Sequence, residues 1–198
     1  MAKIVVLNSG GFDSVTLMKY LYTVQEEREI HSLHFLYGAR NTYQQERCVD
    51  KVCREVGAVN LKTTLPPIVW TKGEFYQSGY EQEKQYLEYR NLIFLSYAAS
   101  YAESIGAEKI YVAFLNQHDY PDTTVEFLRG MNSFLELNGI SIDAPFIFDN
   151  KTRVGHIAKY LGITEKDYFS CDNPKVNGEP CGECADCKAL EEIRKKLS

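Results

Sequence analysis

The chain has 198 residues and a formal charge of −5 at pH 7, because 22 basic side chains stand against 27 acidic ones. With 44% hydrophobic and 25% charged residues, its composition is typical of a globular protein and argues against a disordered chain. The acidic excess argues against a surface that coats DNA or RNA. The apolar runs are too short to cross a bilayer. We therefore expect one domain with a small appendage and, without a secretion signal at Met1, a cytoplasmic location.

Strands and helices alternate along most of the chain. Short apolar runs predict strands at 3–8, 30–37, 59–65, 109–115 and 140–147. Apolar residues at helical spacing predict helices at 15–25, 44–56, 91–105, from Thr123 or Thr124 to 137, and at 153–161. A final charged helix is expected at 189–197. The segment 68–89 has no clear period and is rich in tyrosine, so it is read as an irregular insertion or lid and as a candidate contact in a homodimer.

This alternation predicts an α/β fold, an open twisted parallel sheet with helices on both faces. Residues 1–165 are expected to form a nucleotide-binding unit, and 166–198 a cysteine-rich extension. In such sheets ligands bind beyond the carboxyl ends of the strands, where loops lead into helices. The loop after the first strand is therefore the first place to look for a site.

That loop reads Ser9-Gly10-Gly11-Phe12-Asp13-Ser14. Two glycines allow the backbone to approach an anion closely, and the N–H groups of the following helix point at it. The loop has no lysine, and Asp13 would repel a phosphate unless a cation intervened, which suggests Mg²⁺ between Asp13 and a polyphosphate. A tight turn with Asp13 and Ser14 as helix-capping groups is the alternative. The position between a strand and a helix favours phosphate binding.

Four of the six cysteines lie together near the end of the sequence, at Cys171, Cys181, Cys184 and Cys187. Four thiolates at this spacing form a closed tetrahedral site, so a structural zinc ion is expected. Free buried thiols, a redox dithiol and an iron–sulfur cluster are the alternatives. Cys48 and Cys53 lie five residues apart on a predicted helix and are expected in the core.

The loop SGGFDS resembles the PP-loop signature, SGG-x-DS, of ATP pyrophosphatases. Together with C-x9-C-x2-C-x2-C, it makes nearly the whole chain resemble the 7-cyano-7-deazaguanine synthase family. Four further segments resemble motifs of this family. Residues 89–95 resemble its RN-x-x-F-L helix start, and 120–122 its Y-P-D element. Residues 144–151 resemble its A-P…[ST]-K segment, and 35–40 match parts of its F-D-Y-G-Q-R strand end. The resemblance implies that the ATP-binding residues are Asn8, Ser9, Gly10, Gly11, Phe12, Asp13, Ser14 and Val15.

The resemblance also implies a ligase reaction. ATP would adenylate the carboxylate of 7-carboxy-7-deazaguanine, and ammonia would displace AMP to give the amide. A second ATP would activate the amide oxygen, and loss of AMP would leave the nitrile. Because the developing negative charge needs cations, Asp13 (through Mg²⁺), Arg90 and Lys151 are the expected catalytic residues. The expected substrate-binding residues are Tyr37, Arg90, Tyr120 and Asp122.

Departures from the family pattern keep other functions open. Leu36, Ala39 and Asn41 replace D, Q and H of the strand end, and Thr123-Thr124 replaces C-R. One alternative is therefore a relative that adenylates the same acid but stops at the amide, or couples it to an amine on another molecule such as a protein. A tRNA-modifying PP-loop enzyme and a nucleotide-binding regulatory module are further alternatives.

Two kinds of side chain have a simpler structural interpretation. Asp122 could cap the helix that follows it instead of binding a base. The four histidines are expected to be structural or to lie at the rim of the site: they are His31, His34, His118 and His156.

Overall fold

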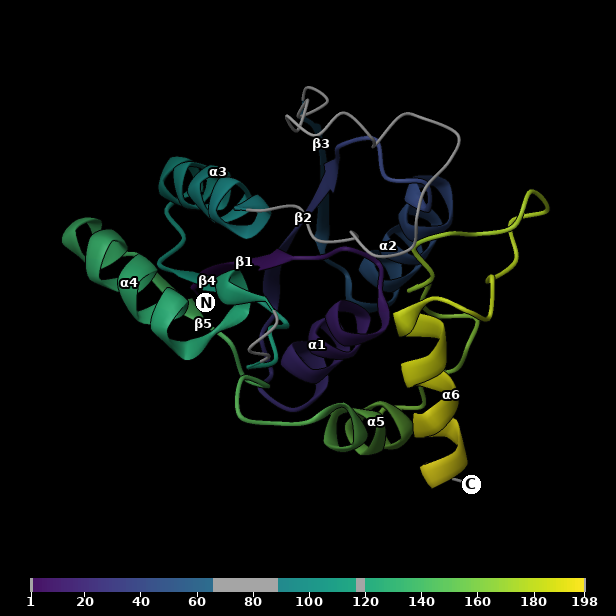
Figure 1. Cartoon of the computed structure of the whole chain (residues 1–198). Coiled ribbons are helices and arrows are strands. Elements are labelled where there is room, and N and C mark those ends of the chain that lie inside the picture. Colours follow the sequence, from purple (N-terminus) through teal and green to yellow (C-terminus); the bar gives the residue numbers. More distant parts are fainter. Residues whose placement is uncertain (1, 66–88, 117–119, 198) are drawn as a thin grey trace.

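The computed structural model describes residues 2–65, 89–116 and 120–197, and its strands form one parallel sheet in the order β3-β2-β1-β4-β5 (Figure 1). The strands are β1 (Lys3–Leu7), β2 (Glu29–Leu36), β3 (Val59–Thr64), β4 (Lys109–Tyr111) and β5 (Ser141–Asp143). The helices are α1 (Phe12–Thr23), α2 (Thr42–Val56), α3 (Arg90–Ile105), α4 (Val125–Leu135), α5 (Lys151–Tyr160) and α6 (Ala185–Leu197). The predicted α/β fold is confirmed.

Two apolar cores lie on opposite faces of the sheet. Helices α1, α2, α5 and α6 pack on one face, and α3 and α4 on the other (Figure 1). Residues of β1 alternate between them, with Ile4 and Val6 in the first core and Val5 in the second. This is the two-residue period of a strand whose faces are both buried. From β1, successive strands are added first on one side (β2, β3) and then on the other (β4, β5). The loop after β1 therefore lies at the point where the strand order reverses, which is where α/β sheets bind ligands.

Every described α-helix except α4 begins earlier than the apolar pattern predicts. α2 begins at Thr42 instead of residue 44, and α3 at Arg90 instead of residue 91. α1 begins at Phe12 instead of residue 15, and α5 begins at Lys151 instead of residue 153, after Asn150, whose side chain accepts the Arg153 N–H at 2.9 Å. α6 begins at Ala185 instead of residue 189, which places Cys187 in its first turn. The first turn of a helix favours polar and acidic residues, and an apolar period does not register them.

Four strands are shorter than predicted, β1 and β3 by one residue each and β4 and β5 by more. β4 ends at Tyr111 instead of residue 115, and β5 spans 141–143 instead of 140–147. The chain turns directly after β5: the Ile147 N–H donates to the Ala144 carbonyl at 3.0 Å, and Pro145 takes the second position of this turn, which suits proline. α4 is capped by Thr124, which accepts the Phe127 N–H at 3.2 Å, and after Leu135 it continues as one 3₁₀ turn over Glu136–Asn138.

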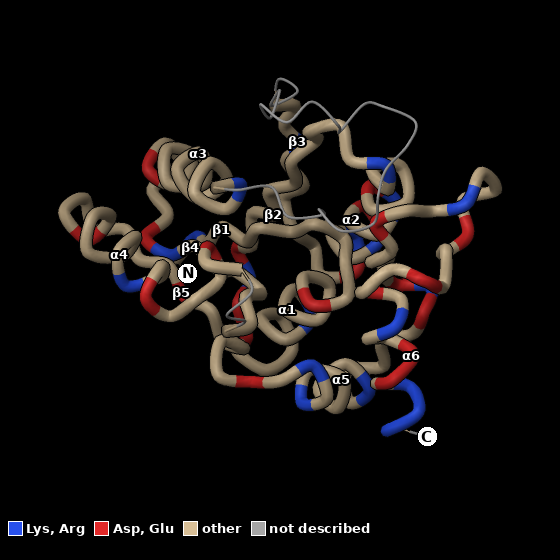
Figure 2. Tube along the Cα trace, in the orientation of Figure 1, with Lys and Arg blue, Asp and Glu red and all other residues tan. Residues whose placement is uncertain are grey.

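Charged side chains are interspersed over the helices (Figure 2). α6 begins with an acidic first turn at Asp186 and ends with Arg194, Lys195 and Lys196, the polarity that suits the helix dipole. None of the helices in the described part of the chain is both long and apolar enough to cross a membrane. The predicted insertion at 68–89 lies outside the described residues, apart from Tyr89.

Candidate functional site

The loop between β1 and α1 is held in shape by its own side chains. Asn8 accepts the Gly10 N–H through Oδ1 at 3.0 Å and donates from Nδ2 to Ser32 Oγ at 3.1 Å. Ser9 Oγ accepts the Gly11 N–H at 3.2 Å and lies 3.0 Å from Ser14 Oγ. These hydrogen bonds fix the shape of the loop next to the positive end of α1.

Gly10 has a φ of +78°, and a Cβ atom at this position would overlap the backbone carbonyl of Gln45. We expect Gly10→Ala to lower the free energy of unfolding by about 3 kcal/mol, about 1 for the left-handed backbone and about 2 for the overlap. Gly57→Ala is the matched control: its φ is +67°, but nothing lies within 4 Å of the added carbon. Urea unfolding of both variants tests this, and equal losses would contradict it.

Residues 169–173, which we call the strap, run against this loop. The Phe169 N–H donates to the Gly10 carbonyl at 2.9 Å, and Ser170 Oγ accepts the Phe12 N–H at 2.8 Å. The sequence analysis missed Ser170. Its 158-residue separation from Phe12 leaves no periodic trace, and only its place beside Cys171 could have drawn attention to it.

A cavity of about 390 Å³ lies between the loop, the end of β2, the start of α3 and the cysteine-rich extension. This volume lies within the range of small-molecule sites. Predicted site residues that line it are Asn8, Ser9, Gly11, Phe12, Asp13, Ser14, Tyr37 and Arg90. Residues that the sequence analysis did not assign to it include His34, Phe94, Ser170, Asp172, Glu183 and Asp186. Two of the predicted metal ligands, Cys181 and Cys184, also line it. The other predicted site residues are outside this lining: Gly10, Val15, Tyr120, Asp122, Lys151, Cys171 and Cys187.

One wall of the cavity is aromatic. Phe35 stacks on Phe94 with ring centroids 4.3 Å apart and planes 5° apart, and Tyr37 contacts Phe94 at 5.4 Å. Arg90, the first residue of α3, donates to the Tyr37 hydroxyl at 3.3 Å. A planar base can stack on such a wall while the guanidinium binds an anionic group beside it.

Opposite charges meet at the phosphate loop. Lys151 Nζ forms an ion pair with Asp13 Oδ2, so two of the predicted catalytic residues are in contact. Burial acts to lower the pKa of Lys151, but the charge and hydrogen bond of Asp13 outweigh it and raise the pKa above its ordinary value. Lys151 therefore stays protonated at neutral pH.

The cysteine-rich extension adds two carboxyl groups to the cavity. Burial, followed by the nearby charge of Asp186, raises the pKa of Asp172 to about 6. Burial also raises the pKa of Asp186, although Lys151 acts in the opposite direction. No spacing pattern in the sequence predicts that these two residues meet, because Asp172 follows the first cysteine of the cluster and Asp186 precedes the last.

Asp122 is almost fully buried and contacts the start of α3. Its Oδ2 accepts the Asn91 N–H at 3.1 Å, and its backbone carbonyl accepts from Asn91 Nδ2 at 3.3 Å. The helix that follows Asp122 is capped by Thr124 instead. Asp122 therefore positions the first turn of α3, which carries Arg90, while its role in binding a base stays a prediction.

His34 is 2% exposed at the end of β2. Its Nδ1 lies 2.8 Å from the Asn8 carbonyl, which can only accept, so the proton sits on Nδ1. Burial lowers the pKa of His34, although the Asn8 hydrogen bond opposes this. The imidazole is thus a neutral support for the residue that orders the phosphate loop.

A buried neutral histidine makes the fold sensitive to acid. The unfolded imidazole takes up a proton below about pH 6.5 while the folded one resists, so the free energy of unfolding falls as pH drops through this range. The slope for one proton is at most about 1.4 kcal/mol per pH unit. We expect His34→Asn, which retains a donor for Asn8, to reduce the stability difference between about pH 7.5 and about pH 5.5. Urea unfolding at both pH values tests this, and His156→Asn at an exposed position of α5 is the control. If His34→Asn leaves the stability difference between the two pH values unchanged, the prediction is contradicted.

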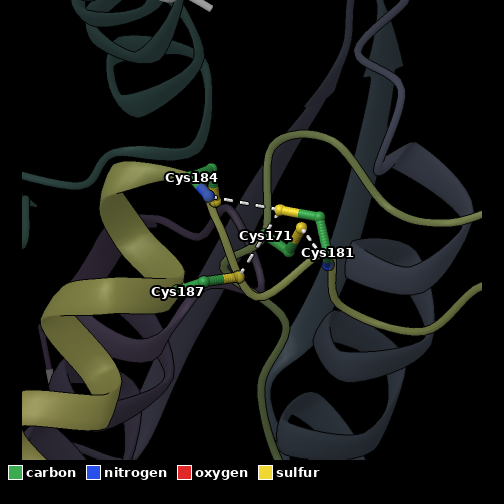
Figure 3. Close-up of side chains that lie close together, drawn as sticks. All are labelled: Cys171, Cys181, Cys184 and Cys187. Atoms are coloured by element: carbon green, nitrogen blue, oxygen red, sulfur yellow. Dashed lines mark hydrogen bonds between the residues drawn. The ribbon is translucent and has the colours of Figure 1, made fainter.

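The four cysteines converge at the start of α6 (Figure 3). Their sulfur atoms all lie within 4.8 Å of one another, and those of Cys181 and Cys187 are 3.9 Å apart. A tetrahedral ion with metal–sulfur bonds of about 2.3 Å would separate its sulfurs by about 3.8 Å. Burial acts to raise the pKa of Cys181, but the N–H groups of Glu183 and Cys184 outweigh it and lower that pKa to about 7. The cluster fits a single metal ion, as predicted. Cys48 and Cys53 are buried residues of α2 itself and lie outside the cluster.

The fold is similar to that of two solved structures. The U34-tRNA thiolase NcsA from Methanococcus maripaludis, solved with its [4Fe-4S] cluster, aligns with a TM-score of 0.55 at 10% identity, over 99% of this chain and 66% of the thiolase chain. NMN synthetase from Francisella tularensis aligns with a TM-score of 0.54 at 14% identity, over 98% of this chain and 76% of the synthetase. Fold and loop together define an α/β protein of the PP-loop class.

The sequence comparisons narrow this class to one family. The family model described as queuosine biosynthesis protein QueC matches residues 3–196, and the chain belongs to that family. Proteins named 7-cyano-7-deazaguanine synthase are 32% identical in Clostridium kluyveri (99% of this chain, 94% of the relative) and 31% identical in Archaeoglobus fulgidus (93% and 82%). The family resemblance expected from the motifs is confirmed, and the relatives indicate an enzyme.

Proposed function

We propose that this protein converts 7-carboxy-7-deazaguanine and ammonia to 7-cyano-7-deazaguanine at the expense of two ATP. The observation that carries the proposal is the Lys151–Asp13 ion pair at a phosphate loop that opens into an aromatic-walled cavity. Membership of the QueC family and the names of the relatives support the choice of substrate.

A carboxylate is a poor electrophile until its oxygen becomes part of a good leaving group. In the first half, a carboxylate oxygen attacks the α-phosphate of ATP, releases diphosphate and forms an acyl adenylate. Ammonia adds to the acyl carbon, and AMP leaves with that oxygen to give the amide. In the second half, the amide oxygen attacks the α-phosphate of a second ATP and releases diphosphate. The amide nitrogen then loses both of its protons, and AMP leaves with the oxygen to give the nitrile.

The residues of the site supply binding and charge for both halves. The backbone N–H groups of Asp13 and Ser14 at the start of α1 and the hydroxyls of Ser9 and Ser14 bind the phosphates. Lys151 and Arg90 offset the negative charge that develops as the α-phosphate is attacked. Asp13 holds Lys151 in place and supplies an oxygen ligand for Mg²⁺, which would stabilise the charge of the leaving diphosphate. The base stacks on Tyr37 and Phe94.

Zinc is the proposed metal of the cysteine cluster. Four sulfurs within 4.8 Å fit one tetrahedral ion, whereas a cube of four irons and four sulfides would hold its thiolates further apart. With four protein ligands the ion has no open position, so its role is structural in an extension, 166–198, of the nucleotide-binding unit.

Product analysis tests the function. The protein is incubated with 7-carboxy-7-deazaguanine, ATP, Mg²⁺ and ammonium, and products are identified by mass spectrometry while AMP is quantified. We expect the nitrile with two AMP per product. Amide that accumulates without nitrile would contradict the proposal, and absence of AMP with any deazapurine acid would contradict adenylation itself.

A second candidate is coupling of the activated acid to an amine on another molecule. Ala39 and Asn41, which depart from the family pattern, both line the cavity, so the surroundings of the incoming nucleophile differ from those in the pattern. The same assay with a primary amine or an acceptor protein in place of ammonium distinguishes the two. A stable amide conjugate formed in preference to nitrile would favour coupling.

A further inference from the structure

The strap takes up one of the backbone N–H groups that the start of a helix normally offers to an anion. Phe12 is the first residue of α1, and its N–H is taken by Ser170 Oγ at 2.8 Å. The Gly10 carbonyl on the other side of the turn accepts the Phe169 N–H at 2.9 Å. The strap therefore fixes both sides of the turn and leaves the following N–H groups of α1, those of Asp13 and Ser14, at the positive end of the helix.

The strap is in turn fixed to α2 and to the cysteine cluster. Asn41, which is 4% exposed, donates from Nδ2 to the Cys171 carbonyl at 3.0 Å, and Gln45 Nε2 donates to the Phe169 carbonyl at 3.4 Å. Cys171 is itself one of the four clustered thiols and is 2% exposed. One peptide bond therefore separates a metal ligand from the side chain that contacts the phosphate loop.

The space around the Ser170 hydroxyl is closely filled. A Cβ atom on Gly11 would lie 3.4 Å from Ser170 Oγ and 3.2 Å from Ser9 Oγ. The hydroxyl thus packs against the glycine turn as well as accepting its hydrogen bond. Removal of the hydroxyl would leave a part-buried N–H of the turn without its partner and open space beside a glycine.

We propose that Ser170 is a positioning residue through which the metal centre and the nucleotide site are coupled. The proposal rests on nucleotide binding at the phosphate loop, as in the proposed function. A metal ion that binds Cys171 restricts the strap, and the restricted strap holds the loop in the conformation that accepts phosphates. Because such coupling is reciprocal, the nucleotide must tighten metal binding by the same factor as the metal tightens nucleotide binding.

Three variants isolate the hydroxyl. Ser170→Ala removes it, and Ser170→Thr retains a hydroxyl at the same position. Ser133→Ala is the matched control, since Ser133 is exposed on α4 and its Oγ donates to the Arg129 carbonyl of its own helix. Calorimetry gives the affinity of each metal-loaded protein for a non-hydrolysable ATP analogue. A chromogenic chelator then gives the rate of metal release with and without the analogue.

We expect Ser170→Ala to bind the analogue about tenfold more weakly, which corresponds to the loss of one hydrogen bond to a part-buried group. Its metal content should stay that of the native protein. In the native protein and in Ser133→Ala the analogue should slow metal release severalfold; in Ser170→Ala it should have little effect, and Ser170→Thr should restore it. The metal-release measurement needs no stripped protein, so it remains informative even if the metal-free chain unfolds.

Two results would overturn the proposal, and they differ. If the native protein binds the analogue and Ser170→Ala binds it equally well with the same slowing of metal release, Ser170 is only a structural residue. If the native protein binds no analogue at all, the proposed function fails and the coupling fails with it.

Discussion

Lys151→Met is expected to lower the rate of AMP release by roughly 10²- to 10³-fold, the usual cost of losing one preorganised charge that stabilises a transition state. Lys151 lies in the first turn of α5, and its ion pair with Asp13 aims the ammonium group at the phosphate loop. Since that pair raises the pKa of Lys151, the charge is present throughout the neutral range. The loss should appear in kcat more than in KM, because the charge develops in the transition state.

Lys159→Met on the same helix is the matched control. The Lys159 ammonium donates to the Leu197 carbonyl in α6, far along the helix from the loop, so this variant should keep the native rate. Steady-state assays of AMP release on both variants, with thermal unfolding to confirm folding, separate the two effects. Native activity in a folded Lys151→Met protein would remove Lys151 from the mechanism.

Cys184→Ala is expected to abolish stoichiometric metal binding and to lower the free energy of unfolding by at least about 3 kcal/mol. The reason is that a closed metal site contributes its binding energy to folding. Cys184 is 8% exposed, and its sulfur is one of the four that converge at the start of α6. Without one ligand, the other three thiols, of which only Cys171 is buried, lose most of the metal that holds them together.

Cys48→Ala makes the same chemical change at a buried thiol outside the cluster. It should retain the metal and cost only about 1 kcal/mol, as expected for a small core deletion. Elemental analysis for zinc and iron, together with urea unfolding, checks both variants. A Cys184→Ala protein with full metal content and native stability would contradict the four-ligand site, and iron in the native protein would contradict zinc.

The sheet and the loop could be predicted because they depend on local pattern. A buried parallel strand is a nearly continuous apolar run, and the glycine turn after 3–8 lies at the carboxyl end of such a run. The predicted ends were less accurate where capping and turn residues decide them. Asn150 caps α5, Pro145 lies in the turn that follows β5, and neither residue belongs to an apolar period.

The cavity could be predicted only on the side built from contiguous motifs. Arg90 and Tyr37 were predicted through their motifs; both line the cavity, and Arg90 donates to the Tyr37 hydroxyl. Ser170, Asp172 and Asp186 were missed because each reaches the cavity only when the extension packs against the loop. Asp122 belongs to a recognised motif, yet its visible contact is with the α3 backbone, a role that depends on tertiary structure.

The contact between Phe12 and Ser170 also has a consequence for the order of folding. The two residues are 158 positions apart, so the phosphate loop is translated long before its partner emerges from the ribosome. Closing a loop of this length carries an entropic cost that local strand pairing avoids. Until the extension emerges, the Phe12 N–H at the start of α1 lacks its Ser170 partner and bonds to water. We expect a newly made chain to acquire nucleotide affinity late, after the extension has emerged and can close over the loop.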